Sequence, residues 1–260
     1  MKAPTAPWRW ALAGALVGAL SVALLNAPAR WLAAGLARAS GERVQLVEPE
    51  GSVWRGSARL LLTGGAGSHD RSALPGRLHW RLSPGWGGVA IGLNADCCTP
   101  HGPLALTLAP RWGGARLRVA DGRSLWPAAL LDGLGTPFNT LQPRGELALA
   151  TRGLDVQWLA GRLQLAGRAE LTARHVSSRL STLHPLGSYQ AVLDGGESLT
   201  LALSTLEGSA LQLSGSGQWV GPRLRFRGEA SAAPGLEATL ANLLNVLGRR
   251  QGDRALIAFG

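Results

Sequence analysis

The chain has 260 residues, with 26 basic and 16 acidic side chains that give a formal net charge of +10, and Lys2 is its only lysine. The lack of a second lysine excludes the phosphate-binding P-loop, protein-kinase chemistry and Schiff-base catalysis, which all need a lysine side chain. Charged residues make up only 16% of the chain and there are 36 glycines. Since about 25% and ~7% are the usual fractions, this composition favours a turn-rich β protein over a helical enzyme.

An apolar segment near the N-terminus runs from Ala11 to Ala27 and carries only two polar side chains, Ser21 and Asn26. As a helix it would extend roughly 26 Å, which is near the lower limit for crossing a bilayer. Tryptophans lie at both ends of the segment and positive charge precedes it, as expected where a helix enters and leaves a membrane. We therefore predict a transmembrane signal-anchor helix over residues 10–29.

This predicted helix divides the chain into three parts. Residues 1–9 carry Lys2 and Arg9 as well as the amino terminus, so the positive-inside rule places them in the cytoplasm. Residues 30–260 follow the helix as one periplasmic β domain. The alternative is a cleaved signal peptide, because Ala27-Pro28-Ala29 fits a small-x-small cleavage site. Both interpretations export everything after about residue 30.

Apolar and polar residues alternate with a period of two along much of the exported part, which is typical of strands with one apolar face. The clearest examples are residues 77–82, 116–119, 162–165, 198–203 and 211–214. Glycine and proline punctuate these segments at residues 64–65, 84–85, 113–114, 195–196 and 221–222. Such short interruptions indicate hairpins between antiparallel neighbours. We expect about ten to fourteen strands in one large, twisted sheet that curls or packs on itself.

Three segments break this alternation. Leu32–Ala39 is expected to continue the membrane helix into the exported space. Pro127–Leu134 opens with proline at a suitable first helical position and is predicted to form a short helix. The leucines of residues 236–247 recur on one helical face before Gly248 and predict a second short helix. The predicted fold class is mainly β: an N-terminal transmembrane helix, then a large twisted, mostly antiparallel β-sheet domain with two short helices.

No set of catalytic groups can be assembled from the motifs of this sequence. The run Ser214-Gly215-Ser216-Gly217 matches neither the serine-hydrolase elbow nor the dinucleotide-binding fingerprint, so we interpret its glycines as turn residues. Acidic pairs such as Glu48/Glu50 flank turn residues, where solvated carboxylates are common. The histidines are scattered along the chain: His69, His79, His101, His175 and His184. We therefore predict no catalytic residue, no metal site, no cofactor and no enzymatic activity.

One cluster of potential metal ligands lies within five residues and consists of Cys97, Cys98 and His101. Adjacent cysteines seldom reach one ion with good geometry, and no second pair completes a zinc motif. A vicinal disulfide, two free buried thiols and an intermolecular bridge are the alternatives in an oxidising compartment. The sequence does not choose between them, and Asp96–Pro103 is predicted to be a loop.

The positive charge indicates what the exported part can bind. Arginine recurs at every second residue, as in Arg223, Arg225 and Arg227, which is typical of the solvated face of a strand rather than of a nucleic-acid groove. A basic surface instead favours lipid headgroups or acidic protein faces. Tryptophans in or beside strands are expected to anchor the core. They are Trp54, Trp80, Trp86, Trp112, Trp158 and Trp219.

Three sequence features together resemble a known family. After the N-terminal segment come Gly51-Ser52-Val53-Trp54-Arg55-Gly56, then His184-Pro185-Leu186-Gly187-Ser188-Tyr189, then a Gly-Ser-Gly-x-Trp run through Gly215 and Trp219 to the leucine helix. The chain resembles the type II secretion system protein N family, also called general secretion pathway protein N, nearly from end to end. It also resembles, more distantly, AsmA-type envelope proteins, whose curved sheets offer an apolar trough to lipid. Neither resemblance supplies an active site.

The resemblance implies a non-enzymatic, accessory inner-membrane component of the type II secretion system of Gram-negative bacteria. Such a protein would support transport of folded exoproteins across the outer membrane through a periplasmic docking domain. Its partners would be other proteins of that system and the inner membrane, with no nucleic acid and with its oligomeric state left open. The alternative is an AsmA-like protein that handles lipid or maintains the envelope, using the apolar face of its sheet.

Overall fold

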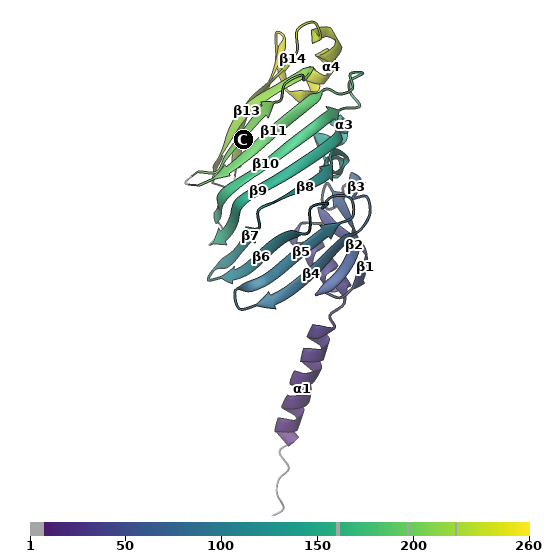
Figure 1. Cartoon of the computed structure of the whole chain (residues 1–260), viewed down its shortest axis with the longest axis vertical. Coiled ribbons are helices and arrows are strands. Elements are labelled where there is room, and N and C mark those ends of the chain that lie inside the picture. Colours follow the sequence, from purple (N-terminus) through teal and green to yellow (C-terminus); the bar gives the residue numbers. More distant parts are fainter. Residues whose placement is uncertain (1–7, 160–161, 197, 222) are drawn as a thin grey trace, which may run out of the picture.

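The structure is a computed structural model that describes residues 8–159, 162–196, 198–221 and 223–260. It confirms the mainly β prediction, because one large antiparallel sheet dominates the molecule (Figure 1). The first half of the sheet contains β1 (Val44–Gly51), β2 (Arg55–Thr63), β3 (Arg71–Ala73), β4 (Leu78–Gly85), β5 (Gly88–Ala95), β6 (Leu104–Arg111), β7 (Gly114–Val119) and β8 (Gly122–Pro127). The second half contains β9 (Arg144–Leu159), β10 (Arg162–Ser177), β11 (Gly187–Gly195), β12 (Thr200–Thr205), β13 (Leu211–Val220), β14 (Arg223–Ala232), β15 (Arg249–Gln251) and β16 (Arg254–Phe259).

The sheet is close to a meander, with the order β1-β2-β4-β5-β6-β7-β9-β10-β11-β12-β13-β14-β16-β15, while β3 pairs with β2 and β8 with β9. The described residues thus form sixteen strands, more than the sequence predicts. The excess comes from three-residue strands such as β3 and from a broken strand. β7 and β8 both pair with β9, β7 with its C-terminal half and β8 with its N-terminal half, and Ala120 and Asp121 separate them.

The predicted transmembrane helix over residues 10–29 is not supported. Helix α1 (Trp8–Leu25) begins with two tryptophans and an arginine in its first turn and ends before Asn26. Its apolar part is therefore about 15 residues or roughly 22 Å long, against a hydrocarbon core of ~30 Å. In the part of the chain that the structure describes, no helix is both long and apolar enough to cross a membrane.

The predicted continuation of this helix through Leu32–Ala39 is also wrong. A separate helix, α2 (Ala29–Ala39), begins after Pro28, which has no N–H group and adopts an extended backbone conformation. Pro28 also bridges to Ser52 next to β1, so the chain changes course there. Ala29 and Ala33 are buried against the sheet. α2 thus belongs to the β domain, whereas α1 projects from it (Figure 1).

The two short helices predicted for the exported part are both present. Residues 128–134 form the 3-10 helix η1 (Ala128–Leu134), which follows Pro127, and the leucine segment forms α4 (Glu237–Leu247), which ends at Gly248. A further helix, α3 (Phe138–Leu141), is a single helical turn that was not predicted from the sequence. Helices α2 and η1 pack near the start of the sheet, while α4 packs against β14 and β16 at its other end.

The alternation of the sequence becomes two chemically different faces of the sheet. Strand pairing places leucines opposite leucines on one face, as in Leu46↔Leu60 and Leu193↔Leu201. The other face carries charged pairs such as Arg168↔Asp194. Two hydrophobic cores lie at opposite ends of the apolar face. The first is built around Trp80 beneath α2 and η1, and the second around the leucines of α4.

Candidate interaction surfaces

Between the two cores lies a stretch of half-buried aliphatic side chains that we call the central apolar surface. Cross-strand pairs such as Ile91↔Leu106 and Leu117↔Val156 show that its members share one face of β5, β6, β7 and β9. The same face continues across β10, β11 and β12. Its members are Ile91, Leu93, Leu106, Leu108, Leu117, Val156, Leu165, Leu193, Leu201 and Leu203.

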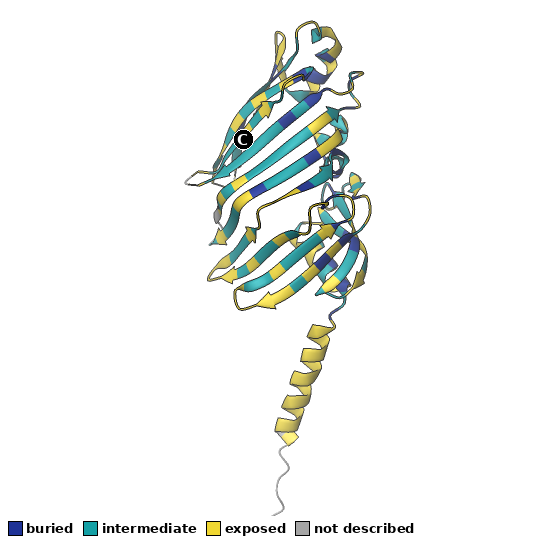
Figure 2. Ribbon diagram, in the orientation of Figure 1, coloured by how far each residue is buried: buried dark blue, intermediate teal, exposed yellow. Residues whose placement is uncertain are grey.

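No helix of the described residues packs extensively over this surface, because α2, η1 and α4 contact the strands at the ends and the start of β9. Its side chains are neither fully buried nor fully solvated, and Leu108 is 40% exposed. Figure 2 shows the same trend, with intermediate burial along most of the central strands. An uncovered row of aliphatic residues is suited to hold an apolar ligand or an apolar partner surface.

The opposite face of the same strands is polar and is organised by ion pairs. Arg116 on β7 donates through Nε to both carboxylate oxygens of Asp155 on β9, at 2.9 and 2.8 Å, and Arg118 lies 3.5 Å from the same carboxylate. The hydrogen bonds from Arg116 hold the pKa of Asp155 below its ordinary value, and the same bonds raise the pKa of Arg116. These groups join the two strands.

A cavity of about 530 Å³ lies on the polar side of the C-terminal strands. Its walls include Thr200, Ser216 and Gln218, with Arg225 and Arg227 beside them. Among the described residues, neither arginine forms an ion pair. The cavity therefore offers hydroxyl and amide groups beside unpaired positive charge, which suits an acidic group of a partner rather than a reaction.

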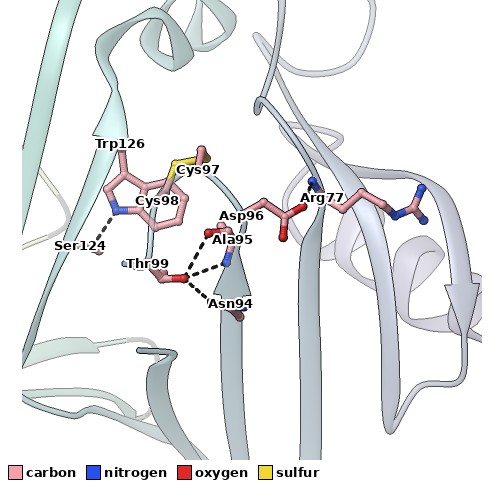
Figure 3. The surroundings of a disulfide bond; sticks show 9 residues. All are labelled: Arg77, Asn94, Ala95, Asp96, Cys97, Cys98, Thr99, Ser124 and Trp126. Carbon is pink, nitrogen blue, oxygen red and sulfur yellow. Dashed lines mark hydrogen bonds between the residues drawn. A yellow bond between two sulfur atoms is a disulfide. The ribbon is translucent and has the colours of Figure 1, made fainter. Parts of the chain in front are cut away.

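The cysteines form a vicinal disulfide, Cys97–Cys98, which is one of the three arrangements that the sequence leaves open. Cys98 is buried in the first core and accepts a 2.8 Å hydrogen bond from the backbone N–H of Leu125, whereas Cys97 is exposed. Figure 3 shows the bond beside Trp126, with the Thr99 hydroxyl bound to Asn94 and Ala95. This segment covers the edge of β8 that faces away from β9.

The third member of that cluster, His101, does not join the cysteines in a metal site. It lines a second cavity of about 200 Å³ next to the break between β7 and β8, together with Asp121 and Arg123. Asp121 already accepts a 2.6 Å hydrogen bond from the backbone N–H of Gly153. Across the described residues, no group of three histidine, cysteine or acidic side chains is placed to hold a metal ion.

The other candidate titratable groups are held in local pairs near the surface. The His79 ring lies 3.2 Å from the Asp96 carboxylate, and both side chains are about half exposed. Glu48 pairs with Arg59, and Glu50 with Arg77. Such exposed pairs stabilise local strand and turn structure only weakly.

The Gly51–Gly56 segment has a structural role that sequence alone could not define. Gly51 has a φ of +83°, and a Cβ at Gly56 would lie 2.5 Å from Cζ2 of Trp80. The indole of Trp80 fills that space and donates to the carbonyl oxygens of Ser52 and Val53, at 3.2 and 3.1 Å. The segment therefore locks the β1–β2 hairpin onto the first core.

The other two segments of the resemblance also serve packing. The buried Tyr189 hydroxyl donates to the Leu211 carbonyl at 3.1 Å, and burial raises the pKa of this phenol well above its ordinary value. Gly215 and Gly217 are not turn residues, because both lie inside β13. A Cβ at Gly215 would lie 2.4 Å from Cζ of Phe226, so the glycines make room for that ring, which stacks on Phe259 at 5.4 Å.

The tryptophans separate into two groups that sequence reasoning did not distinguish. Trp80 is buried, as predicted for a core anchor. Trp86, Trp112 and Trp158 are exposed by 110%, 102% and 63%, so their predicted core role is wrong. The first two lie at the tips of the β4–β5 and β6–β7 hairpins, beyond the last paired residues, where no neighbouring strand can cover an indole. The Gly-Gly pair that follows each of these two tryptophans could have indicated a hairpin tip.

The antiparallel sheet, its two end cores and the uncovered apolar surface between them define a β-sheet protein with broad exposed surfaces. The chain matches the family model for the type II secretion system (T2SS), protein N, over residues 42–257. It therefore belongs to the type II secretion system protein N family and is a component of that secretion system. No curated protein and no solved structure matches the chain.

Proposed function

We propose that the protein is an accessory component acting at the periplasmic face of the inner membrane, where its β domain docks with other type II secretion proteins. In this role it supports the transport of folded exoproteins across the outer membrane. The observation that carries the proposal is the extent of the family match, which runs from just before β1 into β16. The matched part is thus the sheet itself, with the strands that carry both cores.

The free end of the sheet supports docking by strand addition. β15 pairs only with residues 254–256 of β16, and beyond Leu256 no described strand pairs with the outer edge of β16. An unpaired strand edge offers backbone N–H and C=O groups to an extended segment of a partner. Arg249 and Arg250 are exposed beside this edge and favour an acidic segment.

Helix α1 supports attachment to the inner membrane, with residues 30–260 in the periplasm. All of its described side chains are exposed, including Leu12, Leu16, Leu20 and Leu24 at 52% to 69% (Figure 2). Exposed leucine, alanine and valine side chains along a whole helix favour an apolar environment. The headgroup and acyl region of a membrane supplies that environment.

Fractionation tests the attachment. We expect the full chain to sediment with inner membranes, and Leu16→Glu with Leu20→Glu to move it to the soluble periplasmic fraction. The matched control is Leu256→Glu, since Leu256 is also exposed, by 42%, but lies on β16. A native chain whose N-terminus begins at Arg30 would contradict attachment through α1.

Secretion itself tests the main role. Deleting the protein should leave folded exoproteins in the periplasm without broadly changing outer-membrane permeability. Removing one outward N–H group of the strand edge, by Ala258→Pro, should reproduce the secretion defect if docking uses that edge. The Leu256 carbonyl faces Gly248 on the outer side, and backbone groups of alternate strand residues point the same way, so Ala258 N–H points outward. Normal secretion in the deletion strain, under conditions where the system is required, would contradict the proposal.

One observation favours the alternative of lipid handling, namely the central apolar surface. Photo-crosslinking residues placed there at positions 108 and 201 would report its occupant in cells. Positions 107 and 202 are matched controls, because they are the next residues on the same strands and point to the opposite face. Phospholipid adducts at 108 and 201 but not at 107 and 202 favour lipid handling. Adducts to proteins of the secretion system favour docking.

A further inference from the structure

Two neighbouring hairpin tips present fully exposed indole rings. Trp86 at the β4–β5 tip is 110% exposed and Trp112 at the β6–β7 tip is 102% exposed. The register Val89↔Leu108 places the two hairpins side by side in the sheet. Their axes are therefore about 10 Å apart, two strand spacings. A Gly-Gly pair follows each ring, and nothing lies within 4 Å of a Cβ built at Gly87 or Gly113.

These tips lie at the end of the domain from which α1 projects. The Trp54 indole N–H donates to the Leu24 carbonyl near the end of α1 at 2.9 Å, and the Leu82 N–H donates to the Trp54 carbonyl at 2.7 Å. Trp86 follows Leu82 by four residues of the β4–β5 hairpin, roughly 13 Å of extended chain. Figure 1 shows the β4–β5 hairpin at the same end of the sheet as the base of α1.

A third exposed tryptophan belongs to the same end. Trp31 lies in the first turn of α2, four residues after Ala27, whose carbonyl accepts a 2.8 Å hydrogen bond from the Val53 N–H beside Trp54. Its side chain is 57% exposed. Three exposed indoles from three separate segments thus lie at the end of the domain where the chain leaves α1.

The charges around these rings have one sign. Arg111 precedes Trp112 and Arg30 precedes Trp31, and both arginines are exposed. The tip sequences 83–88 and 109–114 contain no acidic residue. Indole rings favour the headgroup level of a bilayer, and arginine favours anionic phospholipids.

We propose that Trp31, Trp86 and Trp112, with Arg30 and Arg111, form a membrane-resting surface that holds the base of the β domain against anionic phospholipid headgroups. The inference rests on the proposed attachment through α1, since that attachment brings this end of the domain to the bilayer. Contact at several points away from α1 fixes the tilt of the domain over the membrane. The free β16 edge at the other end of the sheet is then held away from the lipid.

The test uses the full chain in cells, with a photo-crosslinking residue at position 16, 86, 112 or 220. The residue at position 16 reports whether α1 contacts lipid. Position 220 is the matched control for the tips, because Val220 is 49% exposed at the end of β13, on the same rim of the sheet but far from α1. We expect phospholipid adducts at positions 16, 86 and 112 and none at position 220.

The outcomes separate the two proposals. Lipid adducts at position 16, with none or only protein adducts at positions 86 and 112, overturn the membrane-resting surface and leave the α1 attachment standing. Lipid adducts at 86 and 112 without any at 16 support the surface and overturn the attachment. Adducts at 220 as strong as those at 86 overturn the surface, because they show unspecific lipid contact.

A binding measurement on vesicles gives the size of the effect. The chain with Leu16→Glu and Leu20→Glu, which weakens α1, should still bind vesicles of phosphatidylethanolamine and phosphatidylglycerol. Adding Trp86→Ser and Trp112→Ser should weaken that binding at least about tenfold. The same two substitutions should leave the melting temperature unchanged, since neither ring packs against the domain. Unchanged binding would contradict the proposal.

Discussion

The two cores close the same face of one sheet in different ways. The first gathers contributions from α2, β1, β2, β4, β5, the disulfide segment and η1, and many of its buried residues are small, such as Ala29, Ala58 and Ala95. The second is built largely by one helix, because Leu240, Leu243 and Leu244 of α4 are each at most 1% exposed. A core assembled from many short segments depends on close fit around its one large ring, whereas a helix brings several leucines to the sheet at once.

The difference predicts that the first core is more sensitive to a single change. Trp80→Ala should lower the free energy of unfolding by about 3–5 kcal/mol, because it removes a buried ring and two hydrogen bonds. Hydrogen exchange should then rise mainly in β1, β2, β4 and β5. Equal loss of protection in β13, β14 and β16 would show that the two cores act as one unit. Chemical denaturation gives the size of the effect.

In the second core, Leu243→Ala should cost about 2–5 kcal/mol and raise exchange mainly in α4, β14 and β16. Val246→Ala on the same helix is the matched control, since Val246 is 42% exposed, and should stay within about 0.5 kcal/mol. If the control were as damaging as the core variant, α4 would not pack through the leucine face described here.

The close packing of two aromatic rings against glycines can be tested by adding a methyl group at each glycine. Gly56→Ala and Gly215→Ala should each destabilise the protein by about 1–3 kcal/mol, because the added methyl group would overlap the ring of Trp80 or Phe226. Gly92→Ala is the control, since a Cβ at Gly92 meets nothing within 4 Å. Thermal melts of the three variants check this. A stable Gly56→Ala variant would mean that the Trp80 ring can shift at little cost.

A smaller effect is expected for the Tyr189 hydroxyl. Tyr189→Phe keeps the ring in the second core and removes only the hydrogen bond to the Leu211 carbonyl, so it should cost about 1 kcal/mol. Tyr189→Leu also removes ring contacts and should cost more. If Tyr189→Phe left the free energy of unfolding unchanged in denaturant titrations, the hydrogen bond of the hydroxyl would not contribute to stability.

The smallest effect concerns the ion pair that joins the two halves. Asp155 has a lowered pKa in the folded chain, so it stabilises the fold at pH values above its ordinary pKa of about 4. That contribution is lost as the pH falls through the lowered, folded-state pKa. Asp155→Asn should therefore differ from the native chain at pH 7 and converge with it in acid. The exposed Asp253→Asn is the control, and a constant difference at every pH would contradict the assignment.

Local patterns in the sequence were sufficient for much of the fold. The hairpins, η1 and α4 follow from turn residues and from periods of 2 and 3.6, which depend only on near neighbours. The end of α1 at Leu25 was missed because the apolar composition continues through Ala27, while Pro28 and its bridge to Ser52 begin a new element.

The features that could not be predicted correctly depend on contacts between residues distant in sequence. Gly215 looks like a turn residue until Phe226 is placed across the strand pair, and the sequence does not reveal that pairing. Trp80 and Trp86 lie in one hairpin, yet only the first has a sheet face to cover it. The state of the two cysteines likewise needed the positions of both sulfur atoms.

The meander order of the strands has a consequence for how the chain can fold. Because β2 pairs with β1, β10 with β9 and β14 with β13, nearly every strand finds its first partner among residues that the ribosome has already made. Contacts between consecutive strands keep the sequence separation small and the entropy cost of loop closure low. β8 and β15 are exceptions, since their partners β9 and β16 are synthesised after them. The sheet can therefore grow at one edge in the order of synthesis, with pauses where its two halves join and at its last hairpin.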